Sequence, residues 1–215
     1  MLKLYSYFRS SAAYRVRIAL NLKGLTHEII PVHLLRNGGE QNLPEYRSKN
    51  PLALIPALDT DDATLIQSMA ILEYLEEAYP NPALLPDGLT ARARVRAIAQ
   101  TVVSEIHPLN NLRVLDYLAN NLQHDNEDKL DWYRHWINEG FTGIEILLGS
   151  SPETGLFCHG DTPTLADCCL IPQVYNARRF NCPLEHFPII QRISTECDKL
   201  AAFQNAAPDN QPDAE

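Results

Sequence analysis

Apolar and polar positions alternate in short runs near the start of the chain. A period of two over residues 2–7 and 28–34 predicts two strands, because alternate side chains of a strand face opposite sides of a sheet. Between them, apolar residues recur at helical spacing over 12–23 and stop at Gly24, a residue typical of helix ends. A strand, a helix and a strand in this order predict a βαβ unit.

The next patterned stretch predicts a hairpin followed by a helix. Apolar segments at 55–58 and 64–66 flank the run DTDD, whose residues favour turns. Ser68 then precedes a helical pattern, and its hydroxyl is suited to capping the first turn. The apolar residues of that helix share one face: Ile71, Leu72, Leu75 and Ala78.

A proline-rich segment separates this α/β region from a region of helical periodicity. Prolines and a glycine crowd into residues 81–90, and such a density of helix breakers is typical of a linker. We therefore predict two domains, residues 1–80 and residues 91–215. The second is predicted to be all-helical, because helical spacing without a period-two run covers 90–121, 129–148, 164–180 and 188–203.

Three local features of the second domain can also be predicted. Pro108 is expected to kink the first helix, since proline removes a backbone donor and clashes with the preceding turn. Thr164 and Asp167 form a variant of the hydroxyl-x-x-acid pattern that caps a helix start. The polar, proline-bearing tail after Ala207 is expected to fray.

Composition narrows the class of protein. A formal net charge of -9 and a pI near 5.2 disfavour general attraction to nucleic acid or to an acidic membrane surface. No apolar run reaches the length of a membrane span, and the first residues lack a signal-peptide pattern, so we expect a cytoplasmic protein. The cysteines lack paired metal or redox spacing, and we interpret them as reduced packing residues with no metal site: Cys158, Cys168, Cys169, Cys182 and Cys197.

The most informative chemistry lies where loops lead into helices. Ser10 and Ser11 follow the first strand and precede the helix, where the first backbone N–H groups lack helical partners. Ile55-Pro56 and then Gln67-Ser68 repeat the arrangement of a loop that leads to a helix start. Helix N-termini bind anions, so this half of the chain is predicted to hold one small anionic ligand. Simple capping is the alternative explanation for the serines.

Several blocks of sequence resemble one protein family, in that family's order. The blocks are SSAAYRVRIAL, NPLALIPAL, IQSMAILEYLEE, IHPLNNLRVL and DTPTLADCCLIPQVYNARRF. With the α/β first half and the helical second half, they resemble the zeta class of glutathione transferases over nearly the whole chain. The resemblance implies a thioredoxin-like first domain, an all-helical second domain, glutathione as the cofactor and a homodimer.

The resemblance implies roles in binding glutathione for the residues of the first block and the proline step. Ser10 would face the glutathione sulfur and, with the positive end of the helix, favour its thiolate, while Ser11 shares the same helix start. Ile55 and Pro56 would form a cis step whose main chain pairs with the cysteinyl part of glutathione.

Further residues would complete the glutathione site. Gln67 and Ser68 would hold the γ-glutamyl part, and Gln41 would lie at the glycyl end in a polar loop. His107 and Asn111 match positions that in the family face the cleft or the partner subunit's glutathione. A packed, hydrogen-bonded histidine is the alternative for His107.

Two features bear on the second substrate. Zeta-class enzymes often have a cysteine after the two serines, whereas this chain has Ala12 and Ala13, which disfavours reductase chemistry through a mixed disulfide.

The substrates of the class carry carboxylates, which arginine binds through two hydrogen bonds. The matching arginines are Arg9, Arg113 and Arg179, with Arg178 an ambiguous neighbour. A solvated surface charge is the alternative for each.

The resemblance therefore implies a glutathione-dependent cis-trans isomerase with Ser10, Ser11 and Arg9 as catalytic residues. Maleylacetoacetate, from aromatic amino acid degradation, is the first candidate for its dicarboxylate substrate, and maleylpyruvate is the alternative. A general zeta-class transferase is a further alternative. A non-catalytic interaction module is disfavoured, because the chain retains the serines and the Gln67-Ser68 pair.

Overall fold

The computed structural model of the chain describes residues 1–215 and contains two compact units. The first unit comprises Met1–Leu84 and Asp198–Glu215, and the second comprises Leu85–Cys197. The last residues of the chain therefore group with the α/β unit, whereas the sequence analysis assigned them to the helical domain.

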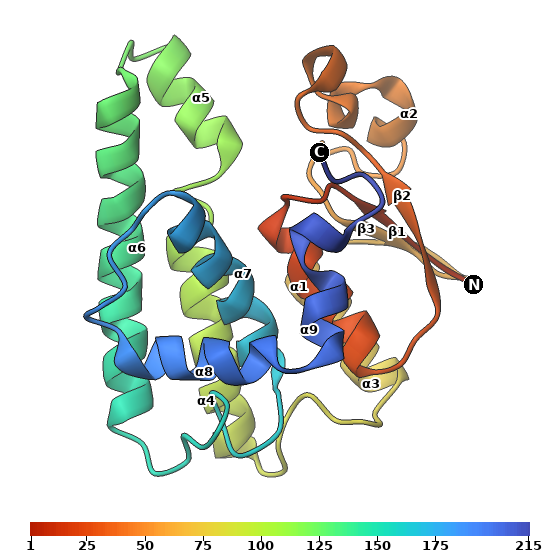
Figure 1. Cartoon of the computed structure of the whole chain (residues 1–215). Helices are drawn as coiled ribbons and strands as arrows, with labels where there is room; N and C mark the ends of the chain where they lie inside the picture. Colours follow the sequence, from red (N-terminus) through yellow and green to blue (C-terminus); the bar gives the residue numbers. More distant parts are fainter. The chain divides into compact units, whose positions relative to one another are not determined.

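The first unit is built on a four-stranded sheet in the order β2-β1-β3-β4 (Figure 1). The strands are β1 Leu2–Ser6, β2 His27–Pro31, β3 Ala57–Asp59 and β4 Thr64–Ile66. β1 runs parallel to β2 and antiparallel to β3, and β3 runs antiparallel to β4. The predicted βαβ unit and hairpin are confirmed, and the mixed sheet is that of a thioredoxin-like domain.

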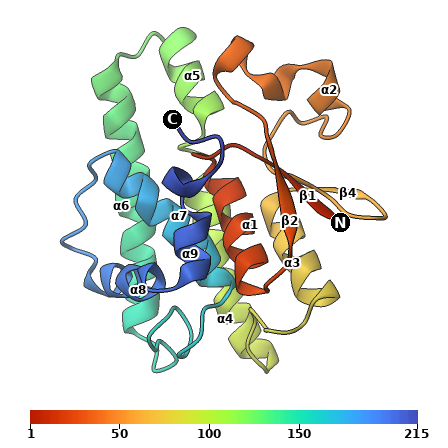
Figure 2. The ribbon, with the colours of Figure 1, turned by 45° about the vertical axis from the view of Figure 1, so that its right-hand side comes forward.

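Helices cover both faces of this sheet. The helices of the unit are α1 Ser11–Leu22, α2 Pro44–Arg47, α3 Ser68–Ala78 and α9 Ala201–Ala206. Arg17 of α1 donates to the hydroxyl of Ser6, which places α1 on the face where Leu4 is also buried. Tyr5 points to the opposite face, where its ring lies 6.0 Å from that of Tyr46 in α2. Figures 1 and 2 both show α9 beside α1.

A buried ion pair fastens the end of α1 to the end of α3. The Lys23 ammonium lies 2.8 Å from a carboxylate oxygen of Glu76, and both side chains are almost fully buried. Lys23 also donates to the carbonyls of Tyr79 and Pro82, at 2.7 and 2.9 Å, and Glu76 accepts from the N–H of Leu84. Because several partners satisfy each charge, the pair fixes the start of the proline-rich segment to this unit.

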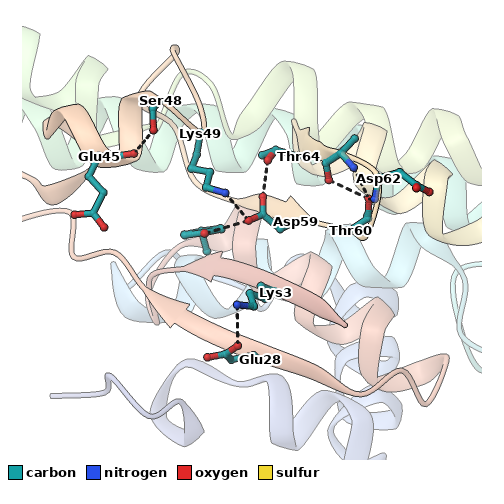
Figure 3. Close-up of polar contacts among 11 residues, drawn as sticks. Lys3, Glu28, Glu45, Ser48, Lys49, Asp59, Thr60, Asp62 and Thr64 are labelled. Carbon is teal, nitrogen blue, oxygen red and sulfur yellow. Dashed lines mark hydrogen bonds and ion pairs between the residues drawn. The ribbon is translucent and has the colours of Figure 1, made fainter.

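A second polar cluster joins the segment after α2 to the β3–β4 hairpin (Figure 3). The Asp59 carboxylate accepts hydrogen bonds from Lys49 at 2.7 Å, from the Tyr5 hydroxyl at 3.1 Å and from Thr64. Burial raises the pKa of Asp59, but the hydrogen bonds from these three residues outweigh burial, and the pKa lies below its ordinary value. The cluster therefore stabilises the ionised carboxylate.

The second unit is all-helical, which confirms the predicted fold class. Its helical segments are α4 Leu89–Gln100, the π-helical turn η3 Thr101–Ile106, α5 Leu112–Asn120, α6 Asn126–Gly149, α7 Leu165–Arg179 and α8 Pro188–Asp198. None of the helices in the chain combines the length and apolar character that crossing a membrane requires.

Two segments that were each predicted as one continuous helix are each divided in the structure. The pattern over 90–121 is not one kinked helix, because the chain turns after η3 and Asn111 caps the separate helix α5. Pro108 therefore lies in a break rather than a kink. The pattern over 188–203 is divided between α8 and α9, with Leu200 in an extended conformation between them.

The predicted capping box is present at the start of α7. An Asp167 carboxylate oxygen accepts from the Thr164 N–H at 2.8 Å, and its other oxygen accepts from the N–H of Cys158 at 2.9 Å. Burial raises the pKa of Asp167, although these hydrogen bonds oppose the rise. Stabilisation of the fold accounts for this residue pair, as the sequence suggested. All five cysteines are buried and none forms a disulfide, in agreement with their interpretation as packing residues.

The C-terminal tail does not fray, which corrects the sequence prediction. Pro208–Asn210 form a short 3-10 helix after α9. Asp213 accepts a hydrogen bond from the N–H of Phe8, and Glu215 pairs with Arg36. The partners lie near the other end of the chain, so no local pattern in the tail could reveal them.

Candidate functional site

Four loops of the first unit meet at one edge of its sheet. In the strand register Tyr5 lies beside Ile30 and Ala57, and Ala57 lies beside Ile66. β1, β2 and β4 therefore end at the edge where β3 begins. The loops at this edge carry every predicted site residue of the unit: Arg9, Ser10, Ser11, Gln41, Ile55, Pro56, Gln67 and Ser68.

Ser10 is the N-cap of α1. Its hydroxyl oxygen accepts from the Ala13 N–H at 3.2 Å, and its own N–H donates to the Tyr7 carbonyl at 2.9 Å. An accepting hydroxyl keeps its proton for donation to a ligand. The first turn of α1 contains no acidic residue, so no carboxylate of the helix itself offsets the positive end of its dipole. Ser11 is the first residue of the helix and is buried. Ser10 is therefore a helix cap, as in the alternative explanation, but its hydroxyl proton remains available for donation at the helix N-terminus.

Two side chains hold the loop that leads into β3. The Leu54 carbonyl accepts from the Tyr46 hydroxyl at 2.7 Å and from the Asn50 amide at 2.6 Å. The next peptide bond, Ile55-Pro56, is cis. Ile55 is buried in the same hydrophobic cluster as Tyr7 and Phe8.

Gln67, rather than Ser68, is the N-cap of α3, which corrects the sequence prediction. Gln67 has φ 68° and ψ 115°, and its side chain makes no capping hydrogen bond. Such a conformation costs about 1–3 kcal/mol and tends to occur at ligand sites. The buried Ser68 hydroxyl instead accepts from the Arg15 guanidinium at 3.1 Å. Arg15 therefore joins α1 to the N-terminus of α3. The local sequence around Ser68 could not show that its hydroxyl bonds to Arg15 instead of capping the helix.

Gln41 lies in a loop of two short 3-10 helices, η1 Arg36–Gly38 and η2 Glu40–Asn42. Its side chain lies over Gly39, where φ is +93° and where an added Cβ would come within 2.5 Å of the Gln41 amide. The positive φ favours glycine, whereas the amide at the end of the flexible Gln41 side chain would only have to move aside to admit a Cβ. The amide oxygen of Gln41 is buried and has no hydrogen-bond partner. Since an unsatisfied buried acceptor is costly, a ligand N–H is its natural partner.

The loop that carries Gln41 is closed by His33 and Glu40. The His33 N–H donates to a Glu40 carboxylate oxygen at 2.6 Å, and the Glu40 N–H donates to the His33 carbonyl at 2.8 Å. The His33 ring accepts from the N–H groups of Leu35 and Arg36 through Nδ1. These contacts turn the chain away from the sheet, so β2 ends before the predicted residue 34.

In the second unit, His107 and Asn111 flank the turn between η3 and α5. The His107 N–H donates to the Val102 carbonyl at 2.9 Å, and the Asn111 side chain accepts from the Arg113 N–H at 3.2 Å. Asn111 therefore has a capping role. Both residues are partly exposed.

The same turn is fixed to α6 by two hydrogen bonds. Trp132 donates its indole N–H to the Leu109 carbonyl at 2.8 Å, and the Asn110 amide donates to the Tyr133 carbonyl at 3.1 Å. Trp132 therefore has a structural role, because it fixes the turn to α6.

Arg113 and Arg179 are exposed residues at helix ends. Arg113 lies in the first turn of α5, and Arg179 ends α7 with its guanidinium 5.0 Å from the Phe180 ring centre. Phe180 packs with its ring centre 4.0 Å from that of Tyr133, the residue whose carbonyl also holds the turn before α5. Both arginines thus extend from segments fixed to one stretch of α6.

Two other arginines differ from this pair. Arg9 belongs to the first unit, where its guanidinium lies 4.7 Å from the centre of the Phe8 ring. Arg178, the ambiguous neighbour, donates to the Ser194 hydroxyl at 3.1 Å. That contact fixes Arg178 to α8 and gives it a structural role.

Sequence reasoning missed residues that position the loops rather than form their surface. Arg15, Tyr46 and Asn50 are buried and bond to Ser68 or to the Leu54 carbonyl. The sequence did contain one signal: Arg15 lies among apolar residues of the predicted helix, and a buried guanidinium needs hydrogen-bond acceptors. The identity of those acceptors required the fold.

The chain is similar to known proteins over its whole length. Residues 1–77 match the family "Glutathione S-transferase, N-terminal domain". A Vibrio cholerae protein named "Probable maleylacetoacetate isomerase" is 50% identical over 98% of this chain and 97% of its own length.

Two solved structures are similar in both fold and sequence. The holo structure of a maleyl pyruvate isomerase, described as a bacterial glutathione S-transferase in the zeta class, has a TM-score of 0.97 and 47% identity, covering 99% of this chain and 100% of its own. A maleylacetoacetate isomerase from Methylobacterium extorquens AM1 with bound malonate and GSH has a TM-score of 0.95 and 40% identity, covering 99% of both chains.

Proposed function

Since this chain belongs to the zeta class of glutathione transferases, we propose that it isomerises the cis double bond of a maleyl diketo acid, with maleylacetoacetate as first candidate. The product would then be fumarylacetoacetate. The observation that carries the proposal is the Ser10 hydroxyl, which accepts from Ala13 and so keeps its proton for donation at the N-terminus of α1, a helix with no acidic residue in its first turn.

The cofactor is glutathione, which the M. extorquens relative binds. The residues at the sheet edge fit its parts. The strained Gln67 and the N-terminus of α3 suit the γ-glutamyl carboxylate, and the main chain of Ile55 suits the cysteinyl amide. The buried amide oxygen of Gln41 lacks a donor, which the glycyl N–H would supply. His107 and Asn111 are assigned to the same ligand.

When bound, glutathione supplies the sulfur nucleophile whose addition makes the double bond single and therefore rotatable. The Ser10 hydroxyl donates to the sulfur and, with the positive end of α1, lowers the pKa of the thiol. The hydrogen bond that Ser10 accepts from Ala13 polarises its own O–H and strengthens this donation. Ser11 lies at the same helix start.

Arginines bind the two carboxylates of the substrate in this proposal. A chain of net charge -9 repels a dianion at long range, so local positive charge must attract it. Arg113 and Arg179 are exposed and reach out from helix ends, where a guanidinium can make two hydrogen bonds to a carboxylate. Arg9, next to Ser10, stabilises the negative charge that develops on the keto oxygen. The arginines hold the ends of the acid while its middle rotates.

Maleylpyruvate is the second candidate substrate, and a specific observation favours it. The structure with the TM-score of 0.97 is that of a maleyl pyruvate isomerase. The same residues serve either acid, since both carry two carboxylates around a cis double bond. A general transferase role differs from both, because its product would retain the sulfur.

The test is an isomerisation assay with both acids and a matched cofactor control. The purified chain is mixed with glutathione and either maleylacetoacetate or maleylpyruvate, and loss of the substrate absorbance is followed. We expect turnover of at least one acid, with a sulfur-free product. S-methylglutathione, which has no thiol, should support no turnover. Turnover of neither acid, or equal turnover without a thiol, would contradict the proposal.

The pathway, compartment and oligomeric state that we propose follow from the same family resemblance. We assign the enzyme to aromatic amino acid degradation in the cytoplasm, acting as a homodimer. Light scattering of the purified chain would test the dimer, because a mass equal to one chain of 24.2 kDa would exclude it.

A further inference from the structure

The C-terminal tail contacts two of the loops at the sheet edge, and the proposed reaction does not use it. In Figures 1 and 2, α9 lies beside α1, and the chain continues from α9 to the C-terminus. The tail makes its contacts through Gln211, Asp213 and Glu215 at the end of the chain.

Asp213 fixes the main chain just before Ser10. Its carboxylate accepts from the Phe8 N–H at 3.0 Å, while the Phe8 carbonyl accepts from the Arg17 guanidinium at 3.0 Å. Both polar groups of the Phe8 residue are thereby held between a carboxylate and a guanidinium. Phe8 lies two residues before Ser10. The two contacts therefore fix the main chain that positions the Ser10 hydroxyl.

Arg17 ties the tail and the loop together. This fully buried side chain donates to the Ala206 carbonyl at 2.9 Å and to the Ser6 hydroxyl at 3.0 Å, in addition to Phe8. Gln211 then donates to the Asn205 and Ala207 carbonyls at 2.8 and 2.9 Å. These hydrogen bonds fix the conformation of the chain that follows α9.

Glu215 reaches the loop that carries Gln41. One carboxylate oxygen of Glu215 pairs with the Arg36 guanidinium, and the other lies 3.7 Å from His33 Nε2. His33 Nδ1 accepts two backbone N–H groups, so the neutral ring carries its proton on Nε2, which faces Glu215. One short tail therefore contacts both the Ser10 loop and the Gln41 loop.

We propose that Asp213 and Glu215 are positioning residues for the glutathione site, with Asp213 orienting the Ser10 hydroxyl through Phe8 and Glu215 holding the Gln41 loop through Arg36. This inference rests on the proposed function and adds residues to it. A tail that served folding alone would have no effect on the bound thiol of the folded protein.

The test compares Asp213→Ala with Asp213→Asn and with the control Asp62→Ala. Asparagine keeps an oxygen that can accept from Phe8, and Asp62 is an exposed carboxylate in the hairpin turn of the same unit. Ultraviolet absorbance of the thiolate against pH gives the pKa of bound glutathione, and steady-state kinetics give kcat and KM, both at a temperature where each variant is folded.

We expect Asp213→Ala to raise the pKa of the bound thiol by about one unit and to lower kcat about tenfold, since the Phe8 main chain loses its carboxylate partner and no longer holds the Ser10 hydroxyl toward the sulfur. Asp213→Asn should stay within about twofold of the parent, because its amide still accepts. A folded Asp213→Ala variant with the parent's thiol pKa and kcat would overturn the inference. So would an equal effect of Asp62→Ala.

Glu215→Gln separates the second contact from the first. We expect KM for glutathione to rise about threefold with kcat unchanged, because an exposed ion pair contributes modestly. An unchanged KM would overturn the role of Glu215. If the parent protein binds no glutathione, the proposed function itself fails, and this is visible in the parent measurements before any variant is examined.

Discussion

The two units present their candidate functional residues in different ways. In the first unit, the chemistry comes from main chain and capping geometry that buried side chains hold, as the Ser10 loop shows with its contacts to Arg17 and Asp213. In the second unit, Arg113 and Arg179 are exposed side chains, and only the helix ends that carry them are fixed. If these residues have the proposed roles, activation of the thiol depends on the fold of the first unit, whereas residues that recognise the acid can change without disturbing the fold.

The difference predicts which substitutions damage folding and which damage only catalysis. A residue of the first kind should alter stability and activity together, because its contacts reach several loops. A residue of the second kind should alter the KM for the acid alone.

Arg17→Met should cause the largest loss of stability. It leaves acceptors at Ser6, Phe8 and Ala206 without their donor in the interior, so we expect a loss of about 3–5 kcal/mol in the free energy of unfolding. Urea unfolding measures it. The matched control is Arg113→Met in the second unit, expected within about 0.5 kcal/mol of the parent because the side chain is exposed. Equal losses would remove the contrast between the units.

Ser10→Ala should lower kcat about 100-fold while changing KM for glutathione little, since the hydroxyl acts on the sulfur rather than on binding. Loss of the cap should also cost about 1 kcal/mol of stability. Asp125→Ala is the matched control, because Asp125 caps α6 by accepting from the N–H groups of Glu127 and Asp128. It should cost similar stability and leave kcat unchanged. A Ser10→Ala variant with the parent's kcat would remove the catalytic role of this serine.

The fold could be predicted from the sequence where its signals are local. Strand alternation, the helix after Ser10 and the Thr164–Asp167 box depend on residues within a few positions of one another, and each is present. The break after η3 was missed, because helical spacing continues through Pro108 while Trp132, distant in sequence, holds the turn.

The site was predictable only in part for the same reason. Ser10 and the Ile55-Pro56 step carry local patterns, so their loops could be identified, and strand register then brings them to one edge. Ser68 was misassigned as a cap because its partner is Arg15. Asp213 gave no signal, since the N–H that it accepts from, that of Phe8, lies 205 positions away in the chain.

Arg113→Ala and Arg179→Ala should each raise KM for the acid about tenfold, the value of one lost charge-assisted contact. Stability and KM for glutathione should stay near the parent values, because both side chains are exposed. Lysine at either position should recover only part of the effect, since it cannot form two parallel hydrogen bonds to a carboxylate. A change in KM for glutathione instead would assign the arginines to the cofactor.

Asp59→Asn should have the smallest effect, and it tests whether every polar cluster of the first unit serves the site. Asp59 pairs across the sheet with Lys3, at the end of β3 away from the site loops, so kcat should not change. Its carboxyl has a folded-state pKa below the ordinary value of 3.8, because hydrogen bonds outweigh burial. The ionised form therefore stabilises the folded state above about pH 4, and this contribution, about 1 kcal/mol, is lost as the pH falls through the folded pKa.

Urea unfolding of the parent and Asp59→Asn between pH 7 and pH 3 measures that contribution. The parent should be more stable at neutral pH, and the difference should shrink as the pH falls below about 4. Asp62→Asn, an exposed neighbour outside the cluster, is the control and should show no such trend. If Asp59→Asn lowered kcat as Ser10→Ala does, polar contacts far from the sheet edge would also govern the thiol, and the contrast between the units would no longer depend on which loops a residue holds.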